Sequence, residues 1–103
     1  MAWQDAAPED ALSGARPWLP LRVAGVRLVV AAVDGVWYAV EDRCSHAGCA
    51  FSEDGALEGS DIVCNCHGSE FDIRTGAVRR GPAEVPIRTV PVRFAGGRLE
   101  VDL

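Results

Sequence analysis

The sequence has no apolar run that approaches the roughly 20 residues a membrane-spanning helix needs. Its longest run, from Val26 to Val33, is interrupted by Arg27. The N-terminal stretch MAWQDAAPED is acidic and has neither the basic n-region nor the apolar h-region of a signal peptide. Internal repeats and low-complexity segments are also missing. We therefore expect a cytoplasmic protein that has no membrane partner.

Helical periodicity is almost absent, because only residues 7–12 (APEDAL) could form a helical turn. The segment from Pro17 to Glu41 is rich in Val, Trp and Tyr, and Asp34-Gly35 separates two strand-like runs within it, which is typical of a β-hairpin. The C-terminal segment alternates apolar and polar residues around Gly96-Gly97, which predicts a second hairpin. The pattern predicts an all-β scaffold.

The middle of the chain interrupts this scaffold. Residues 44–75 are rich in glycine, and only residues 62–63 and 70–73 look extended. With 103 residues the chain is expected to form one domain, spanning 1–103, whose small core is only marginally stable alone. A metal centre or a cross-link in the loop-rich segment would help to hold such a core together.

The formal net charge of −5 is unevenly distributed. Residues 41–72 contain eight acidic residues and only one arginine, whereas residues 73–103 contain six arginines and three acids. This charge argues against nucleic acid as a partner. The acidic segment fits a basic docking face on another protein, and an equally good interpretation is that its carboxylates are solvated loop residues that keep the protein soluble.

Soft metal ligands are scarce and lie in two short boxes. The four cysteines and two histidines all fall in CSHAGC at 44–49 and CNCHGS at 64–69. Cys44 and His46 are separated by one residue, and Cys64 and His67 by two. Both side chains of such a pair can reach one metal centre from a tight loop, and thiolates with imidazoles suit zinc or iron–sulfur chemistry.

The mirrored composition of the boxes distinguishes between these metals only in part. A structural zinc site most often has C-x-x-C knuckles, whereas the closely spaced pair in each box, Cys44 with His46 and Cys64 with His67, offers one cysteine and one histidine. Two irons bridged by two sulfides could take the cysteines on one iron and the histidines on the other. A zinc or interaction module without redox activity stays open as an alternative.

The boxes, CSHAGC followed by CNCHGSEFD, resemble those of the Rieske 2Fe–2S proteins, and the similarity covers most of the chain from about Val23 onwards. The resemblance implies the Rieske fold: a small antiparallel β-sandwich or barrel with a cluster-binding loop subdomain, here at about residues 43–83. It also implies one 2Fe–2S cluster as cofactor. The implied ligands are Cys44 and Cys64 on the inner iron and His46 and His67 on the outer iron.

The remaining two cysteines, Cys49 and Cys66, are not needed as ligands. Many small Rieske ferredoxins lack cysteines at these positions, whereas the Rieske subunits of cytochrome bc complexes join their two cluster loops there by a disulfide. The resemblance therefore implies a Cys49–Cys66 disulfide, worth on the order of 3 kcal/mol in the chain-entropy model. The alternative is two reduced cysteines, which a reducing cytoplasm favours.

The resemblance also implies roles for residues around the cluster. Ser69 takes the place of a hydroxyl donor toward a sulfide, and Phe71 stands where the high-potential members have a tyrosine that bonds a ligating sulfur. Backbone N–H groups near Gly48 and Gly68 could point at sulfides, although simple turn geometry explains both glycines equally well. Pro82 belongs to a third loop that would shield the cluster from water.

No enzyme site remains once both histidines are committed to a cluster, and no phosphate-binding or dinucleotide fingerprint is present. We therefore expect a non-enzymatic, monomeric one-electron carrier. The resemblance implies that it takes electrons from a flavin-containing ferredoxin reductase and passes them to a terminal oxygenase, such as an aromatic-ring hydroxylating dioxygenase. The alternative is a higher-potential electron-transfer subunit of a respiratory or oxyanion-oxidising complex.

Overall fold

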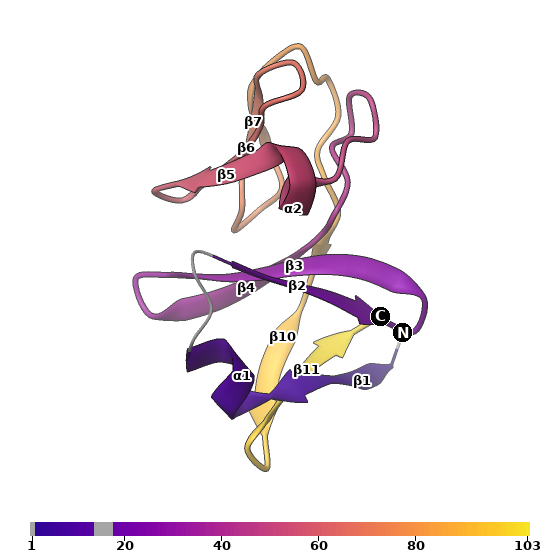
Figure 1. Cartoon of the computed structure of the whole chain (residues 1–103), viewed down its shortest axis with the longest axis vertical. Helices are drawn as coiled ribbons and strands as arrows, with labels where there is room; N and C mark the ends of the chain where they lie inside the picture. The colour runs from indigo at the N-terminus through magenta and orange to yellow at the C-terminus, as the bar shows by residue number, and fades with distance from the viewer. Residues whose placement is uncertain (1, 14–17) are drawn as a thin grey trace.

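Three antiparallel sheets lie one above another along the long axis of the molecule (Figure 1). This computed structural model describes residues 2–13 and 18–103, so Pro17, where the extended segment was expected to begin, lies outside the described residues. We name the sheets lower, central and upper after their places in Figure 1. The all-β, antiparallel class expected from the sequence is confirmed.

The central sheet has the strand order β2-β3-β4-β9 and is buried on both faces. Leu28 and Val30 of β3 pack toward the lower sheet, while Val29 and Ala31 pack toward the upper sheet. This double burial explains why β3 reads as a continuous apolar run rather than as an alternation. The strands are β2 (Trp18–Val23), β3 (Val26–Val33), β4 (Val36–Glu41) and β9 (Thr89–Val90).

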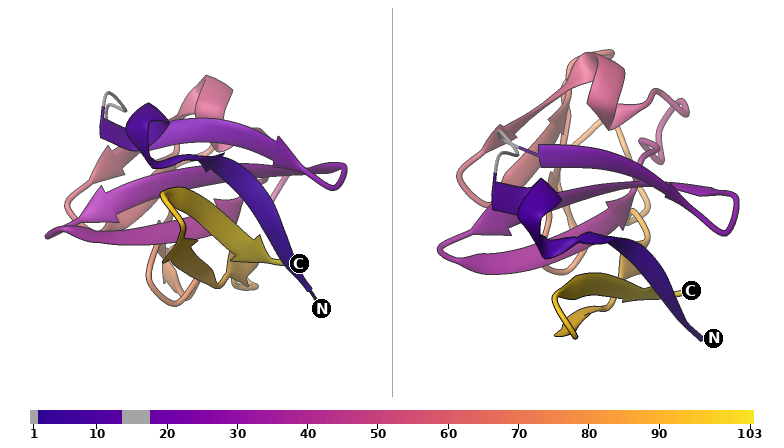
Figure 2. Two further views of the ribbon diagram at one scale, coloured as in Figure 1. Left: turned by 90° about the horizontal axis from the view of Figure 1, so that it is seen from below. Right: turned by 60° about the horizontal axis from the view of Figure 1, so that its bottom comes forward.

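The lower sheet, with the order β1-β11-β10, brings the two ends of the chain together (Figure 2). The N–H of Ala2 donates to the carbonyl of Leu103 at 2.9 Å, and the reciprocal bond is 3.1 Å. The elements of this region are β1 (Trp3–Pro8), α1 (Glu9–Ser13), β10 (Val92–Ala95) and β11 (Arg98–Asp102). The hairpin expected at Gly96-Gly97 is present between β10 and β11.

The expected helical turn starts two residues later than the pattern suggested. Ala7 and Pro8 end β1 instead, because they pair with Leu99 and Arg98 of β11. A pairing partner so distant in the chain cannot be read from local sequence, and it outweighs the helical preference of alanine. Neither helix in the described part of the chain is long and apolar enough to cross a membrane.

The upper sheet is more regular than expected from the glycine-rich sequence. Four strands form it in the order β5-β6-β7-β8, where two short extended pieces were expected. Its core includes Phe51 and Phe71, whose rings meet edge to face with centroids 5.8 Å apart. The elements are α2 (Phe51–Asp54), β5 (Gly55–Glu58), β6 (Asp61–Cys64), β7 (Ser69–Asp72) and β8 (Val78–Arg80).

Gly76 anchors the segment that returns from the upper sheet to the central one. Its carbonyl accepts a 3.0 Å hydrogen bond from the N–H of Ile87, and its own N–H donates to the carbonyl of Asp72 at 2.7 Å. The residue has φ +81, and a Cβ there would overlap the carbonyl oxygen of Ile87. Glycine is therefore required at this position both by backbone conformation and by space.

We expect Gly76→Ala to lower the thermal unfolding midpoint by about 10 °C more than Gly59→Ala does. Gly59 has a similar φ of +62, but no atom lies within 4 Å of the place that a Cβ would take, so alanine there is strained without a clash. Circular dichroism melts of the two variants measure the difference. Equal midpoints would contradict the close approach of Ile87 to Gly76.

Candidate metal centre

The two ligand boxes form two turns of the same kind at one end of the molecule. The first lies between β4 and α2, and the second joins β6 to β7. In each, a glycine N–H donates at 2.9 Å to the carbonyl of the cysteine four residues earlier: Gly48 to Cys44 and Gly68 to Cys64. Both glycines have positive φ, +78 and +86. Their N–H groups are thus engaged in the turns, which favours turn geometry over donation toward a cofactor.

The two free cysteines meet inside the protein. Cys44 and Cys64 are 2% and 1% exposed and belong to the core between the central and upper sheets. Burial raises the pKa of the Cys64 thiol, and its contact with the Cys44 thiol raises that pKa further, while the N–H groups of Cys66 and His67 act in the opposite direction. A positive metal ion bound to both sulfurs would remove this penalty on the thiolate forms.

The two histidines meet at the surface. The ring centroids of His46 and His67 are 4.9 Å apart with an interplanar angle of 83°, and both side chains are exposed. The same two loops therefore bring together a buried pair of thiols and an exposed pair of imidazoles.

Cys49 and Cys66 are joined by a disulfide, as the resemblance implied. The bond links the first turn to the second across 17 positions of sequence, with the Cα atoms 6.7 Å apart. The sulfurs of Cys49, Cys64 and Cys66 lie within 4.8 Å of one another, so the disulfide lies directly beside the buried thiol pair.

A third segment, residues 81–87, packs against both turns through two hydrogen bonds. The hydroxyl of Ser45 donates to the carbonyl of Val85 at 2.6 Å, and the N–H of Ala83 donates to the hydroxyl of Ser69 at 3.0 Å. Ser69 is fully buried, and its hydroxyl proton has no acceptor within the described residues. A cleft of about 490 Å³ opens beside His46; its lining residues are Ser45, His46, Pro82, Glu84 and Val85.

Asp42 connects the first turn to α2, a role that no local pattern in the sequence indicates. Its carboxylate is buried and accepts hydrogen bonds from both the N–H and the hydroxyl of Ser52, with the N–H bond at 2.9 Å. Its own N–H donates to the carbonyl of Arg27 in β3 at 2.9 Å. Asp42 therefore fixes the chain two residues before Cys44 to both the central sheet and α2.

Most of the negative charge in the acidic segment at 41–72 is balanced by arginines that the fold brings close to it. Six of its eight carboxylates lie within 4.0 Å of an arginine, in every case one from outside the segment. Arg74, for example, holds the pKa of Asp72 below its ordinary value through a side-chain hydrogen bond. Among the described residues only Asp54 and Glu58 of this group lack such a pair.

The donor set fits a mixed thiolate and imidazole cluster. Two buried sulfurs and two exposed rings are brought together by paired turns, and a buried hydroxyl with an uncommitted proton lies on the next strand. A single structural zinc ion would leave that hydroxyl and the separation into inner and outer ligand pairs unexplained.

Comparison with known proteins agrees with this chemistry. Residues 2–91 match the family model of the Rieske 2Fe–2S domain. The ferredoxin component of the p-cumate 2,3-dioxygenase system of Pseudomonas putida is 41% identical over 80 residues, covering 78% of this chain and 68% of that protein. The naphthalene 1,2-dioxygenase ferredoxin of Pseudomonas aeruginosa is 39% identical over 85 residues, covering 82% and 81%.

Solved structures show the same fold. The ferredoxin of carbazole 1,9a-dioxygenase from Nocardioides aromaticivorans IC177 superposes with a TM-score of 0.84 at 28% identity, over 98% of this chain and 97% of that one. A chain from a complex of reduced oxygenase and oxidized ferredoxin in carbazole 1,9a-dioxygenase gives 0.81 at 30% identity, over 96% and 91%. The chain therefore belongs to the Rieske 2Fe–2S domain family, whose cofactor is a 2Fe–2S cluster.

Proposed function

We propose that this protein is the ferredoxin of an aromatic-ring hydroxylating dioxygenase system. In this proposal Cys44 and Cys64 hold the inner iron, and His46 and His67 hold the outer iron. The single observation that carries the assignment is the convergence of a buried thiol pair and an exposed imidazole pair on two disulfide-linked turns. The cluster-binding subdomain then comprises about residues 43–83, which contain the upper sheet.

The cluster, when bound, supplies a one-electron redox centre whose mixed ligation makes it easier to reduce than an all-cysteine cluster. The chain would bury the cysteine side of the cluster and expose its histidine side. The cysteines are sealed in the core, while the imidazole edges of His46 and His67 reach the surface and give a partner's redox centre its shortest approach. Residues 81–87 pack against the site from a third side and would shield a bound cluster from water.

The partners follow from the relatives, which are ferredoxin components of dioxygenase systems. A flavin-containing reductase would supply the electron and a terminal oxygenase would receive it. The protein would then have no enzymatic activity of its own, act as a monomer in the cytoplasm, and bind neither nucleic acid nor membrane. The face around His46 suits brief contacts of this kind, because Val85 is 55% exposed and Glu84 is the one charged residue that lines the cleft.

A second candidate, a higher-potential respiratory or oxyanion-oxidising subunit, is favoured by two features. These are the Cys49–Cys66 disulfide and the buried Ser69 hydroxyl. Phe71 weighs against it, because its buried ring cannot donate the hydrogen bond that a tyrosine would. We propose an intermediate potential, inside the Rieske range of about −150 to +300 mV and above that of ferredoxins without the cysteine pair.

Electron paramagnetic resonance of the dithionite-reduced protein tests the cluster directly. We expect a rhombic signal with an average g value below 2, together with a potential in the upper part of the ferredoxin range in the accompanying titration. Colourless protein that contains stoichiometric zinc and gives no signal would overturn the electron-carrier function. A potential at the bottom of the Rieske range would refute the proposed effect of the disulfide and Ser69.

Ser69→Ala is expected to lower the reduction potential, because a donor toward the cluster sulfide stabilises the more negative reduced state. Ser69→Thr keeps the hydroxyl and serves as the matched control, with a smaller shift. Ser69→Ala also removes the acceptor of the Ala83 N–H, which Ser69→Thr keeps, so a thermal melt of each variant reports the change in stability separately from the change in potential. If alanine and threonine gave the same potential, the hydroxyl would have no electronic role.

Removing the disulfide by the double change Cys49→Ser and Cys66→Ser should lower the free energy of unfolding by on the order of 3 kcal/mol. For a chain of this size that corresponds to a fall in the thermal midpoint of about 10–20 °C. The iron content and the visible spectrum should show that fresh protein still binds the cluster, since neither residue is a proposed ligand. Failure to bind any iron at low temperature would show that the disulfide is needed for assembly rather than only for stability.

A further inference from the structure

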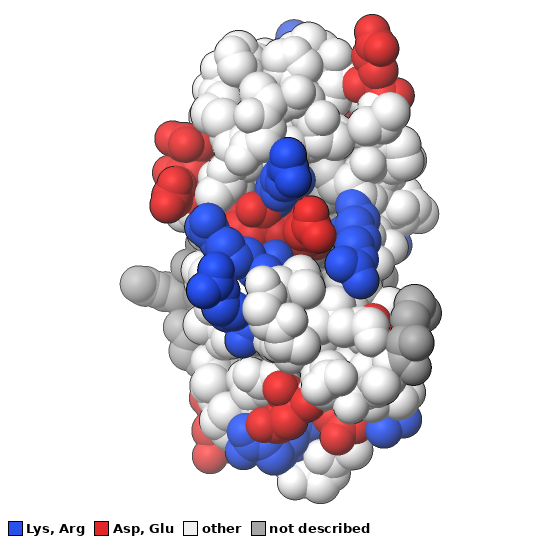
Figure 3. Space-filling view, turned by 90° about the vertical axis from the view of Figure 1, so that its right-hand side faces the viewer, with Lys and Arg blue, Asp and Glu red and all other residues white. Residues whose placement is uncertain are grey.

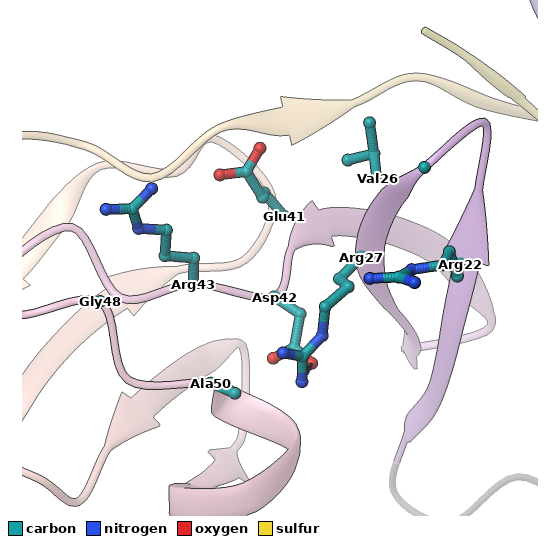
Figure 4. Close-up of a pocket in the computed structure, with 9 residues that line it drawn as sticks. Arg22, Val26, Arg27, Glu41, Asp42, Arg43, Gly48 and Ala50 are labelled. Carbon is teal, nitrogen blue, oxygen red and sulfur yellow. Dashed lines mark ion pairs between the residues drawn. The ribbon is translucent and has the colours of Figure 1, made fainter.

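Three arginines, Arg22, Arg27 and Arg43, line a pocket beside the loop that carries His46. The pocket, about 320 Å³ in volume, lies between the β2–β3 hairpin and the loop of the first box (Figure 4). Arg22 and Arg27 project from the hairpin, while Arg43 lies immediately before Cys44. The loop residues Gly48 and Ala50 complete the lining on the side of the proposed cluster.

Two of these arginines are placed in a way that costs stability. Arg22 and Arg27 are directly opposite each other on neighbouring antiparallel strands, so two like charges share one face of the hairpin. Like charges in such cross-strand positions destabilise a sheet, whereas opposite charges stabilise it. Arg27 has ion-pair partners in the fold, but no ion pair among the described residues accounts for Arg22 opposite it.

The carboxylates nearby do not satisfy the three guanidinium groups. Within residues 2–13 and 18–103, neither Arg22 nor Arg43 forms an ion pair. Arg27 is 3.7 Å from Asp42, and Asp42 already accepts two hydrogen bonds from Ser52.

The remaining acids at the pocket are weak or shared partners. Glu41 is paired with Arg88 at 3.6 Å. Glu53 is 3.9 Å from Arg27 and its side chain is 70% exposed. Figure 3 shows the result, with basic side chains on both sides of an acidic group at mid-height on this face.

We propose that this pocket is a docking site for clustered carboxylates on the surface of a redox partner protein. All ten basic residues of the chain are arginines, and an arginine can bind a carboxylate through two parallel hydrogen bonds. A protein partner is favoured over a free anion because the pocket is an open depression that adjoins the cluster loop, so that bound carboxylates fix the partner beside His46. The inference rests on the proposed electron-carrier function.

The arginine pocket is positive, whereas the net charge of the protein is negative. A net charge of −5 repels an acidic partner at long range, while Arg22, Arg27 and Arg43 attract its carboxylates at contact. Binding would also place an acidic group between Arg22 and Arg27 and relieve their repulsion. The arginines therefore select the orientation of the partner more than they raise the rate of encounter.

Electron transfer from the reduced holoprotein to ferric cytochrome c tests the proposal, with two forms of the same acceptor. Unmodified cytochrome c is basic, and succinylation turns its lysines into carboxylates. Stopped-flow absorbance at 550 nm gives both second-order rate constants. We expect Arg22→Gln with Arg43→Gln to slow reduction of the succinylated form about five-fold at low ionic strength and to leave unmodified cytochrome c no slower.

A matched control removes two arginines from the lower sheet. Arg93→Gln with Arg98→Gln changes the net charge equally, but these residues pair with exposed Glu100 and Asp5 far from the first turn. Equal slowing by both double variants would show only a net-charge effect and would overturn the docking site. Inhibition of the succinylated reaction by 10 mM inorganic phosphate, beyond that of sodium chloride at the same ionic strength, would reassign the pocket to small anions.

A charge reversal separates docking from folding. Arg22→Glu creates an opposite-charge pair with Arg27, so the thermal midpoint should stay the same or rise while transfer to succinylated cytochrome c slows about ten-fold. A variant that is both less stable and no slower would contradict the proposal. If the wild-type protein reduces neither form of cytochrome c, the electron-carrier function itself fails, which is a different outcome from loss of discrimination between the two forms.

Discussion

The structure depends on one constraint: two turns from separate parts of the chain bring the four proposed cluster ligands together at one end of the molecule. The inner pair meets this requirement by being part of the core. Cys44 and Cys64 pack with Phe51 and Phe71 between the central and upper sheets, so the positions of the sulfurs are set by the packing of both sheets. In a domain with so small a core a cluster held by these cysteines would be a structural element as well as a redox centre, because it would neutralise two thiolates that burial alone would disfavour.

The same constraint explains why the proposed cysteine ligands are buried and the proposed histidine ligands are exposed. A cysteine side chain is short and its thiolate is anionic, so it is best buried against the metal, whereas an imidazole is neutral and tolerates contact with water. The exposed histidines can then serve a partner without uncovering the sulfur ligands. Two devices hold this arrangement: the disulfide joins the two turns, and residues 81–87 bind one residue at each turn, Ser45 and Ser69, through one hydrogen bond each.

The fold class and both main hairpins were predicted from local pattern, and the disulfide pairing was implied by the family resemblance; all three are confirmed, while the ligand set stays a prediction. The sequence did not predict the regular upper sheet, since the edge strands β5 and β8 are short and only partly buried. Nor did it indicate the link between Asp42 and Ser52, because a carboxylate that caps a segment ten residues away has no local pattern. The acidic segment at 41–72 could be recognised in the sequence. Its neutralisation could not, because most of its arginine partners come from distant strands.

The charged residues that lack an ion-pair partner therefore say more about where this protein could bind than the net charge of a segment does. Six carboxylates of the acidic segment are paired with arginines, and Glu84 is the one charged residue that lines the cleft beside His46. Against that background Arg22 and Arg27 stand out, because a hairpin that placed an acid opposite an arginine would be more stable. Arg27 is partly compensated by Asp42 and Glu53, whereas the repulsion from Arg22 would be relieved only when a partner's carboxylate binds, which suits a binding surface. The proposed docking pocket and the proposed cluster share the loop from Cys44 to Ala50, so a partner held by the first is held at the second.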